Sequence, residues 1–96
     1  MSHRPMQGVR VLELSQFTFA PTAGAVLADW GADVIKVEHA ETGDAQRGVR
    51  IGWNSERRGS FQPIMEHPNR GKRSIGLDVA TAAGLDILYG LARTCD

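Results

Sequence analysis

Three short segments of the chain have the length of a β-strand, and the first two are largely apolar, as a buried strand is. They lie at residues 9–14, 34–37 and 74–78. A helix is predicted between the first two, because apolar side chains recur there every three or four residues: Ala23, Val26, Leu27 and Trp30. Pro21 suits the first helical position, and Gly31 suits the residue after the last. A strand, a helix and a strand so closely connected predict one parallel, right-handed βαβ unit.

The second half of the chain adds a third strand and a second helix. Residues 40–70 lack sustained periodicity, so we expect a long excursion with about one helical turn, anchored by Trp53 and Phe61. Thr81 is placed to cap the following helix, one face of which carries Gly84, Ile87, Leu88 and Leu91. The alternating strands and helices predict an α/β fold with a parallel sheet. A parallel sheet takes a strand after each crossover helix, so we expect residues 1–96 to begin a longer chain.

Composition restricts the class of protein to which the chain can belong but says little about its activity. The 96 residues carry 11 Lys or Arg and 11 Asp or Glu, and this zero net charge gives no reason to expect nucleic acid as a partner. No apolar run approaches the roughly 20 residues of a membrane span, so we expect no membrane partner. The single cysteine, Cys95, excludes an internal disulfide framework and fits the reducing cytoplasm. His3, His39 and His67 lack metal-ligand spacing, so no metal site is expected.

The turn after the first strand is the first candidate binding site. Ligands of open α/β sheets bind outside the carboxyl ends of the strands, where the following helix offers free N–H groups. The turn holds Gln16, Phe17, Thr18 and Phe19 where a dinucleotide fingerprint needs glycines. These side chains disfavour NAD-type binding but suit packing against an adenine ring or a flexible chain. The alternative interpretation is that Phe17 and Phe19 fill the domain core.

Two further segments carry candidate polar contacts. Glu38 ends the second strand, where an acid often holds a ribose hydroxyl, although a solvated strand end is the favoured interpretation. His39 could stack on a base or, when protonated, bind a phosphate. Residues 40–73 carry seven Lys or Arg against four acids, and this excess of positive charge could attract a polyphosphate. On charge alone a solvated basic loop is favoured, and we expect Asp44 and Arg47 to form an ion pair within it.

Three segments together resemble one enzyme family. The first runs from Gly8 to Glu38, with the sequence Leu-Ala-Asp-Trp-Gly-Ala-Asp-Val-Ile-Lys-Val-Glu at its end. The second is Gly-Asp-x-x-Arg at 43–47, and the third is Asn-Arg-Gly-Lys-Arg-Ser-Ile-Gly-Leu-Asp at 69–78. Their order and intervals resemble the amino-terminus of class III coenzyme A transferases, which include formyl-CoA transferase, carnitine CoA-transferases and the related α-methylacyl-CoA racemases. The resemblance covers nearly the whole chain.

The resemblance implies a much longer enzyme, of which residues 1–96 begin a large Rossmann-like domain that binds CoA. Two such chains would interlock as a homodimer. CoA would move from an acyl-CoA to a carboxylic acid through an aspartyl–CoA thioester, with CoA as a substrate and no covalently bound cofactor. The catalytic aspartate would lie downstream, so no catalytic residue is expected in this chain. CoA would contact the following residues: Gln16, Phe17, Thr18, Phe19, His39, Asn69, Lys72 and Arg73.

Two departures and two alternatives accompany this expectation. His39 stands where the family often has Arg, so a charged contact there is only partly present near neutral pH. Gly71 stands where most members have Asn. The long excursion at 40–70 favours a transferase over a racemase. The other alternative is a non-catalytic CoA- or nucleotide-binding module, whereas the missing glycines disfavour an NAD-dependent oxidoreductase. Lys72 is expected in a solvated loop, outside the core.

Overall fold

A parallel sheet forms the centre of the computed structural model, which describes residues 3–48 and 62–96. Its strands are β1 (Arg10–Glu13), β2 (Asp33–Glu38) and β3 (Arg73–Gly76), in the order β1-β2-β3. Val11 lies opposite Val34, and Val37 opposite Ile75, with all pairs parallel. The predicted α/β class and parallel βαβ unit are therefore confirmed, with strand ends that differ by one or two residues.

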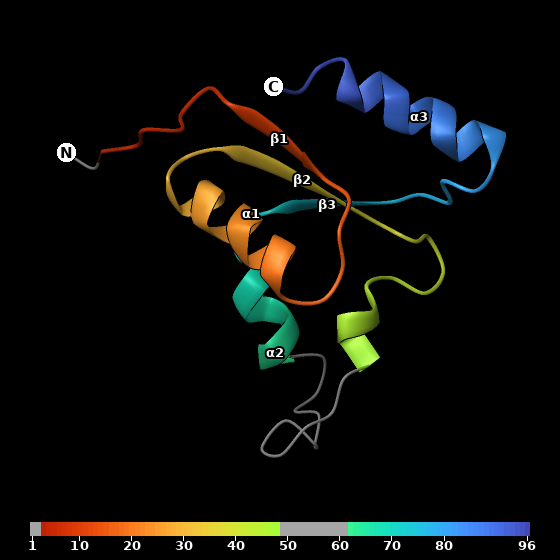
Figure 1. The fold of residues 1–96 in the computed structure, drawn as a ribbon, viewed down its shortest axis with the longest axis horizontal. Helices are drawn as coiled ribbons and strands as arrows, with labels where there is room; N and C mark the ends of the chain where they lie inside the picture. Colours follow the sequence, from red (N-terminus) through yellow and green to blue (C-terminus); the bar gives the residue numbers. More distant parts are fainter. Residues whose placement is uncertain (1–2, 49–61) are drawn as a thin grey trace.

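Helices cover both faces of the sheet (Figure 1). Helix α1 (Phe19–Asp29) lies on one face and packs against η3 (His67–Asn69), which continues from α2 (Pro63–Glu66), and α2 in turn contacts η1 (Ala45–Gly48). Helix α3 (Ala82–Ala92) lies on the other face. The predicted excursion at 40–70 thus contains short helical turns in its described parts. Trp53 and Phe61, the expected anchors, lie outside the described residues.

The face covered by α3 carries the apolar core. Val37, Leu77 and Leu88 are buried together there, and partly buried neighbours pack against them: Leu12, Ile75, Val79, Leu85 and Leu91. The predicted cap is confirmed, because the Gly84 N–H donates to Thr81 Oγ1 at 3.0 Å. The predicted face of this helix is buried in part, since Leu88 lies in the core while Ile87 is half exposed.

The face covered by α1 differs from the predicted pattern. The helix begins at Phe19, two residues before Pro21, and ends before Gly31, whose φ of +103° fits the predicted terminal glycine. Its buried residues are Pro21, Gly24 and Ala25, not the larger side chains. Gly24 explains why, because a Cβ there would lie 2.0 Å from Glu13 Oε1. The helix therefore packs so closely that only small residues fit against the sheet. Among the described residues, no helix has the length and apolarity to cross a membrane.

Candidate functional site

A pocket of about 530 Å³ opens at the carboxyl ends of the strands, immediately after β1. The crevice predicted from the βαβ unit is therefore present at the expected edge of the sheet. Two of the predicted contact residues, Gln16 and His39, line it. The rest of the lining comes from the strand ends and the loop after β2: Leu14, Ser15, Val37, Glu38, Thr42, Gly43, Asp44, Leu77 and Val79.

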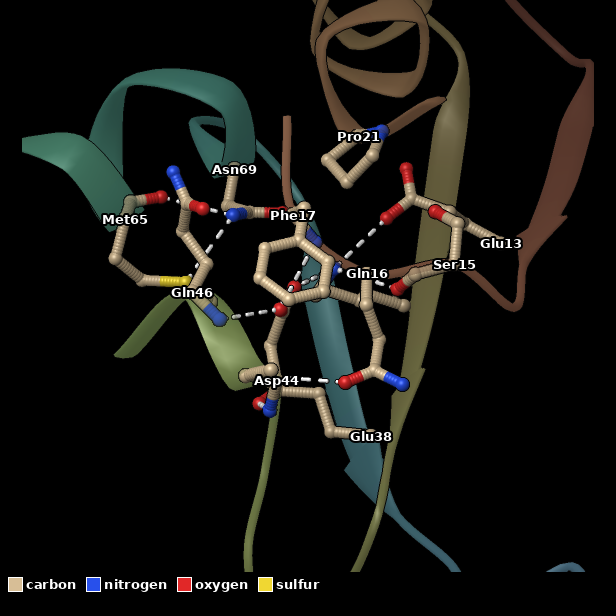
Figure 2. A network of polar contacts seen from close by, with 12 residues as sticks. Glu13, Ser15, Gln16, Phe17, Pro21, Glu38, Asp44, Gln46, Met65 and Asn69 are labelled. Carbon is tan, nitrogen blue, oxygen red and sulfur yellow. Dashed lines mark hydrogen bonds and ion pairs between the residues drawn. The ribbon is translucent and has the colours of Figure 1, made fainter. Parts of the chain in front are cut away.

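The turn after β1 is fastened to the segment that begins at Asp44 (Figure 2). The Phe17 N–H donates to Asp44 Oδ1 at 3.0 Å, and the Ala45 N–H donates to Gln16 Oε1 at 3.0 Å. Gln46 Nε2 donates to Thr18 Oγ1 at 3.3 Å. Three hydrogen bonds thus join two segments that are far apart in sequence.

The two aromatic residues of this turn point away from the core. Phe17 is 51% exposed and Phe19 is 93% exposed. The interpretation that they fill the core is therefore wrong for this structure. Phe17 also has a φ of +67°, a left-handed conformation that is unfavourable for a bulky side chain. The turn thus exposes two large apolar side chains, on a backbone held in an unusual conformation at Phe17, and of its four predicted contact residues only Gln16 lines the pocket.

Four ionised side chains lie buried beneath α1. Lys36 Nζ is 3.1 Å from Glu13 Oε2 and 2.9 Å from Asp44 Oδ2. Lys72 Nζ is 2.7 Å from the other oxygen of Glu13. Two acids and two lysines therefore alternate in a chain, which is a neutral arrangement that makes the burial of charge tolerable. We call these residues (Glu13, Lys36, Asp44 and Lys72) the buried charge network.

Asp44 is the end of this network that faces the turn. Burial by itself would raise the pKa of the Asp44 carboxyl, but hydrogen bonds from the Gln46 and Phe17 backbones and from Lys36 hold it below its usual range. The Gln46 N–H lies 2.9 Å from Asp44 Oδ1. Asp44 is therefore an ionised, enclosed hydrogen-bond acceptor. The expected ion pair between Asp44 and Arg47 is replaced by the pair with Lys36.

Glu38 is buried, so the interpretation of a solvated strand end is wrong. Arg47 donates to both of its oxygens, at 2.7 and 2.8 Å, and the Asp44 N–H donates at 2.7 Å. The hydrogen bonds from Arg47, opposed by burial and helped by the Asp44 N–H, lower the pKa of Glu38 to about 2. Its carboxylate is therefore occupied by protein groups in this structure.

His39 lies at the rim of the pocket. Its Nδ1 accepts hydrogen bonds from the N–H groups of Glu41 and Thr42, at 3.2 and 3.3 Å. Its Nε2 lies 3.8 Å from Asp78 Oδ2. Both ring nitrogens of this pocket-lining side chain therefore lie close to protein groups in this structure.

The three remaining predicted residues lie elsewhere. Lys72 is directed inward with a side chain only 2% exposed, and its Nζ donates to the Pro21 carbonyl at 2.7 Å and to Asn69 Oδ1 at 2.9 Å. The expectation of a solvated lysine is therefore wrong, because Glu13 draws the ammonium into the network. Burial lowers the pKa of Lys72, and the bond with Glu13 offsets part of that effect. Arg73 is 63% exposed and pairs with Asp33 at 2.7 Å, near the opposite end of the sheet.

The structure thus brings the turn and His39 together and separates them from Arg73. Asn69 and Lys72 line a second pocket of about 120 Å³, together with residues of β2, β3, η1 and α2. Sequence reasoning missed Lys36 and Gln46 entirely. A lysine inside an otherwise apolar strand was the available signal for Lys36, since an unpaired charge could not be buried there.

Comparison with known proteins gives consistent matches. The model of CoA-transferase family III matches residues 6–96. The chain is 42% identical over 94 residues to the succinate–glutarate CoA-transferase of Agrobacterium fabrum, which covers 96% of this chain and 24% of that protein. It is 39% identical over 93 residues to a formyl-CoA:oxalate CoA-transferase of Rhodopseudomonas palustris, covering 97% of this chain and 21% of that protein.

Solved structures give the same result. A CaiB/BaiF family protein from Brucella suis matches with a TM-score of 0.81 and 34% identity, over 99% of this chain and 25% of that one. A hypothetical protein from Mycobacterium tuberculosis matches with a TM-score of 0.77 and 38% identity, over 97% of this chain and 24% of its own. The chain therefore spans about a quarter of the length of these relatives.

Proposed function

The chain belongs to CoA-transferase family III, and we propose that it supplies CoA-binding surface to an enzyme that transfers CoA from an acyl-CoA to a carboxylic acid. The observation that carries this proposal is the pocket at the strand ends, which Gln16 and His39 line, with Gln16 in the same turn as the exposed rings of Phe17 and Phe19. An open crevice with flat apolar side chains suits a purine ring and a pantetheine arm. In this proposal residues 1–96 are the amino-terminal part of the large domain.

The proposed contacts differ in what each must do. Gln16, Phe17, Thr18 and Phe19 would pack along the nucleotide and pantetheine, and His39 would meet a base or phosphate at the rim. Asn69, Lys72 and Arg73 were expected to contact CoA, and we keep them as candidate contacts. Lys72 can bind a phosphate only if it exchanges its partner Glu13 or Pro21 for the ligand.

The chemistry of the transfer assigns a limited role to this segment. A catalytic aspartate would attack the thioester carbonyl, the CoA thiolate would leave, and an acyl–aspartyl anhydride would form. The thiolate would then attack the aspartyl carbonyl of that anhydride, release the carboxylate of the first acid and leave an aspartyl–CoA thioester. The acceptor carboxylate would attack this thioester and displace the thiolate, which would then attack the acyl carbonyl of the second anhydride, so that the new acyl-CoA forms and the aspartate is restored. Asp44 is unsuited to this work, because its side chain is fully enclosed and ion-paired. The proposed role of residues 1–96 is therefore to bind and orient CoA, with the nucleophile supplied downstream.

The complete enzyme would be a cytoplasmic homodimer with interlocked chains, as the family resemblance implies. A related α-methylacyl-CoA racemase would use the same half of the fold. The curated relatives described above are named as transferases, which favours CoA transfer for this chain.

Calorimetry on the complete enzyme tests the proposal. We expect CoA to bind far more tightly than NAD, because the turn offers bulky side chains in place of the glycines that a pyrophosphate needs. Incubation with an acyl-CoA and an isotopically labelled carboxylate should move CoA onto the labelled acid. Binding of NAD more tightly than CoA, or epimerisation of a 2-methylacyl-CoA without transfer, would overturn the proposal.

A further inference from the structure

We propose that Asp44 is a positioning residue that holds the CoA-binding turn in its binding conformation through the Phe17 N–H. This inference rests on the proposed function. It assigns a role to the Gly-Asp-x-x-Arg segment, which lies 27 residues from Phe17 in sequence and touches it in space. Asp44 would act on CoA only through the turn, because its own side chain is fully enclosed.

The first step of the argument is the backbone of Phe17. A φ of +67° places this residue in the left-handed region, where a Cβ meets the following carbonyl. Phe17 therefore needs an interaction that offsets this unfavourable conformation. The described structure provides one directed at the backbone itself, the 3.0 Å hydrogen bond to Asp44 Oδ1. A bond from an N–H to an ionised carboxylate is stronger than one to a neutral acceptor.

The second step is that Asp44 cannot follow the turn if the turn moves. Lys36 holds its second oxygen at 2.9 Å, and the Gln46 N–H shares the first at 2.9 Å. The Asp44 N–H is fixed in turn by Glu38 at 2.7 Å. Lys36 is itself held by Glu13 and by the Ser15 carbonyl, at 3.1 and 3.2 Å. The acceptor is therefore anchored to the centre of the sheet.

The third step is that the residues on either side of Phe17 are hydrogen-bonded to the same segment as Phe17. Gln16 and Thr18, on either side of Phe17, bond to Ala45 and to Gln46 respectively. Figure 2 shows the Gln16 side chain reaching the segment that Asp44 begins. Loss of the Asp44 carboxylate would release the central contact and allow Phe17 to return to an ordinary φ. The ring, and with it the apolar surface beside the pocket, would then shift.

A double-mutant cycle on the complete enzyme separates positioning from general destabilisation. Asp44→Ala should weaken CoA binding by about tenfold, the loss expected for one charge-assisted hydrogen bond. Phe17→Gly removes the ring but also the need for a stabilised left-handed backbone, because glycine adopts positive φ freely. In the Phe17→Gly background, Asp44→Ala should therefore change CoA affinity by less than about twofold. Calorimetry is done below the melting transition of every variant.

Glu13→Gln is the matched control. This substitution changes the same network at the contacts with Lys36 and Lys72. Among the described residues, however, Glu13 makes no hydrogen bond to the turn. Its effect on CoA affinity should be the same with Phe17 or with glycine at that position. If Asp44→Ala does not fold, the double substitution Asp44→Ala with Lys36→Met replaces it in the cycle, because it also removes the charge that Asp44→Ala leaves unpaired. Hydrogen exchange at residues 15–18 should also rise more in the Asp44 variants than in Glu13→Gln, because only Asp44 accepts directly from the Phe17 N–H.

The outcomes are distinct. Coupling between positions 17 and 44, together with faster exchange in the turn, supports the inference. Additive effects of the two substitutions in an enzyme that does bind CoA overturn the positioning role and leave the proposed function intact. Failure of the wild-type enzyme to bind CoA overturns both.

Discussion

At the scale of single residues, burial separates two neighbouring basic side chains that look alike in the sequence. Lys72 Nζ lies inside the molecule between Glu13, Pro21 and Asn69, whereas Arg73 lies on the surface beside Asp33. Removing one partner of a buried pair leaves the other charge unpaired, which is strongly destabilising. If both side chains lay in a solvated basic loop, as the sequence predicted, replacing either one would change the stability of the fold little.

We therefore predict that Lys72→Met lowers the free energy of unfolding by about 3 kcal/mol, as measured by urea denaturation of the complete enzyme. Arg73→Met is the matched control and should change stability little, because exposed ion pairs contribute little. Adding Glu13→Gln to Lys72→Met should recover part of the loss, since it removes the unpaired carboxylate. Equal effects of the two single substitutions would contradict the buried placement of Lys72.

Glu38 gives a prediction about pH. Its folded-state pKa of about 2 lies below the ordinary value of 4.5, so the folded protein binds fewer protons than the unfolded chain at intermediate pH. The stabilisation of the folded state that the lowered pKa of Glu38 provides is fully present above pH 4.5 and is lost as the pH falls toward 2. The loss is on the order of 3 kcal/mol. Urea denaturation at several pH values should show a shallower acid decline for Glu38→Gln than for wild type. Identical slopes would contradict the proposed pairing with Arg47.

The sequence predicted the positions of the candidate residues better than their partners. Gln16 and His39 were expected beside a crevice, and the structure places both there, because the ends of parallel strands meet at one edge. The pairing of Asp44 with Lys36 was not predicted, because it depends on which side chains a long excursion brings back over the sheet. Residues 40–48 carry no local pattern that shows which distant side chain will lie beside Asp44.

At the scale of elements, short apolar runs and glycines were sufficient to locate the strands and helix ends. The buried face of α1 was not predictable in this way, because the close approach at Gly24 reverses which residues meet the sheet. Periodicity assigns the larger apolar side chains to the interior, and here small residues take that place.

Two glycines within α3 give a matched test of close approach. A Cβ on Gly84 would lie 2.0 Å from the Asp78 carbonyl oxygen, whereas a Cβ on Gly90 would meet nothing within 4 Å. Alanine has a higher helix propensity than glycine by up to about 1 kcal/mol, so Gly90→Ala should raise the melting temperature of the complete protein. Gly84→Ala should lower it, because the backbone of the capping turn must move. A rise in both variants would show that the turn at Asp78 is not closely packed.

At the scale of the whole molecule, residues 1–96 expose apolar side chains on both sides of the sheet. Phe19 and Trp30 are exposed on the α1 side, and Ile87 and Tyr89 on α3. Large exposed apolar areas indicate surfaces that another part of a protein covers. We therefore expect the isolated 96-residue chain to self-associate at micromolar concentration and to lack a sharp thermal transition. A monomeric mass in sedimentation, together with a cooperative melt, would contradict this expectation.

The alternating charges beneath α1 also restrict how this sequence can diverge. Replacing any one member by a neutral residue breaks electroneutrality in an enclosed layer, so a single step passes through a less stable protein. Replacing an acid and its lysine together restores balance, and well-packed apolar side chains could then take their place. Among diverged sequences that keep this fold, positions 13, 36, 44 and 72 should therefore vary in concert: Glu13 with Lys72, and Asp44 with Lys36.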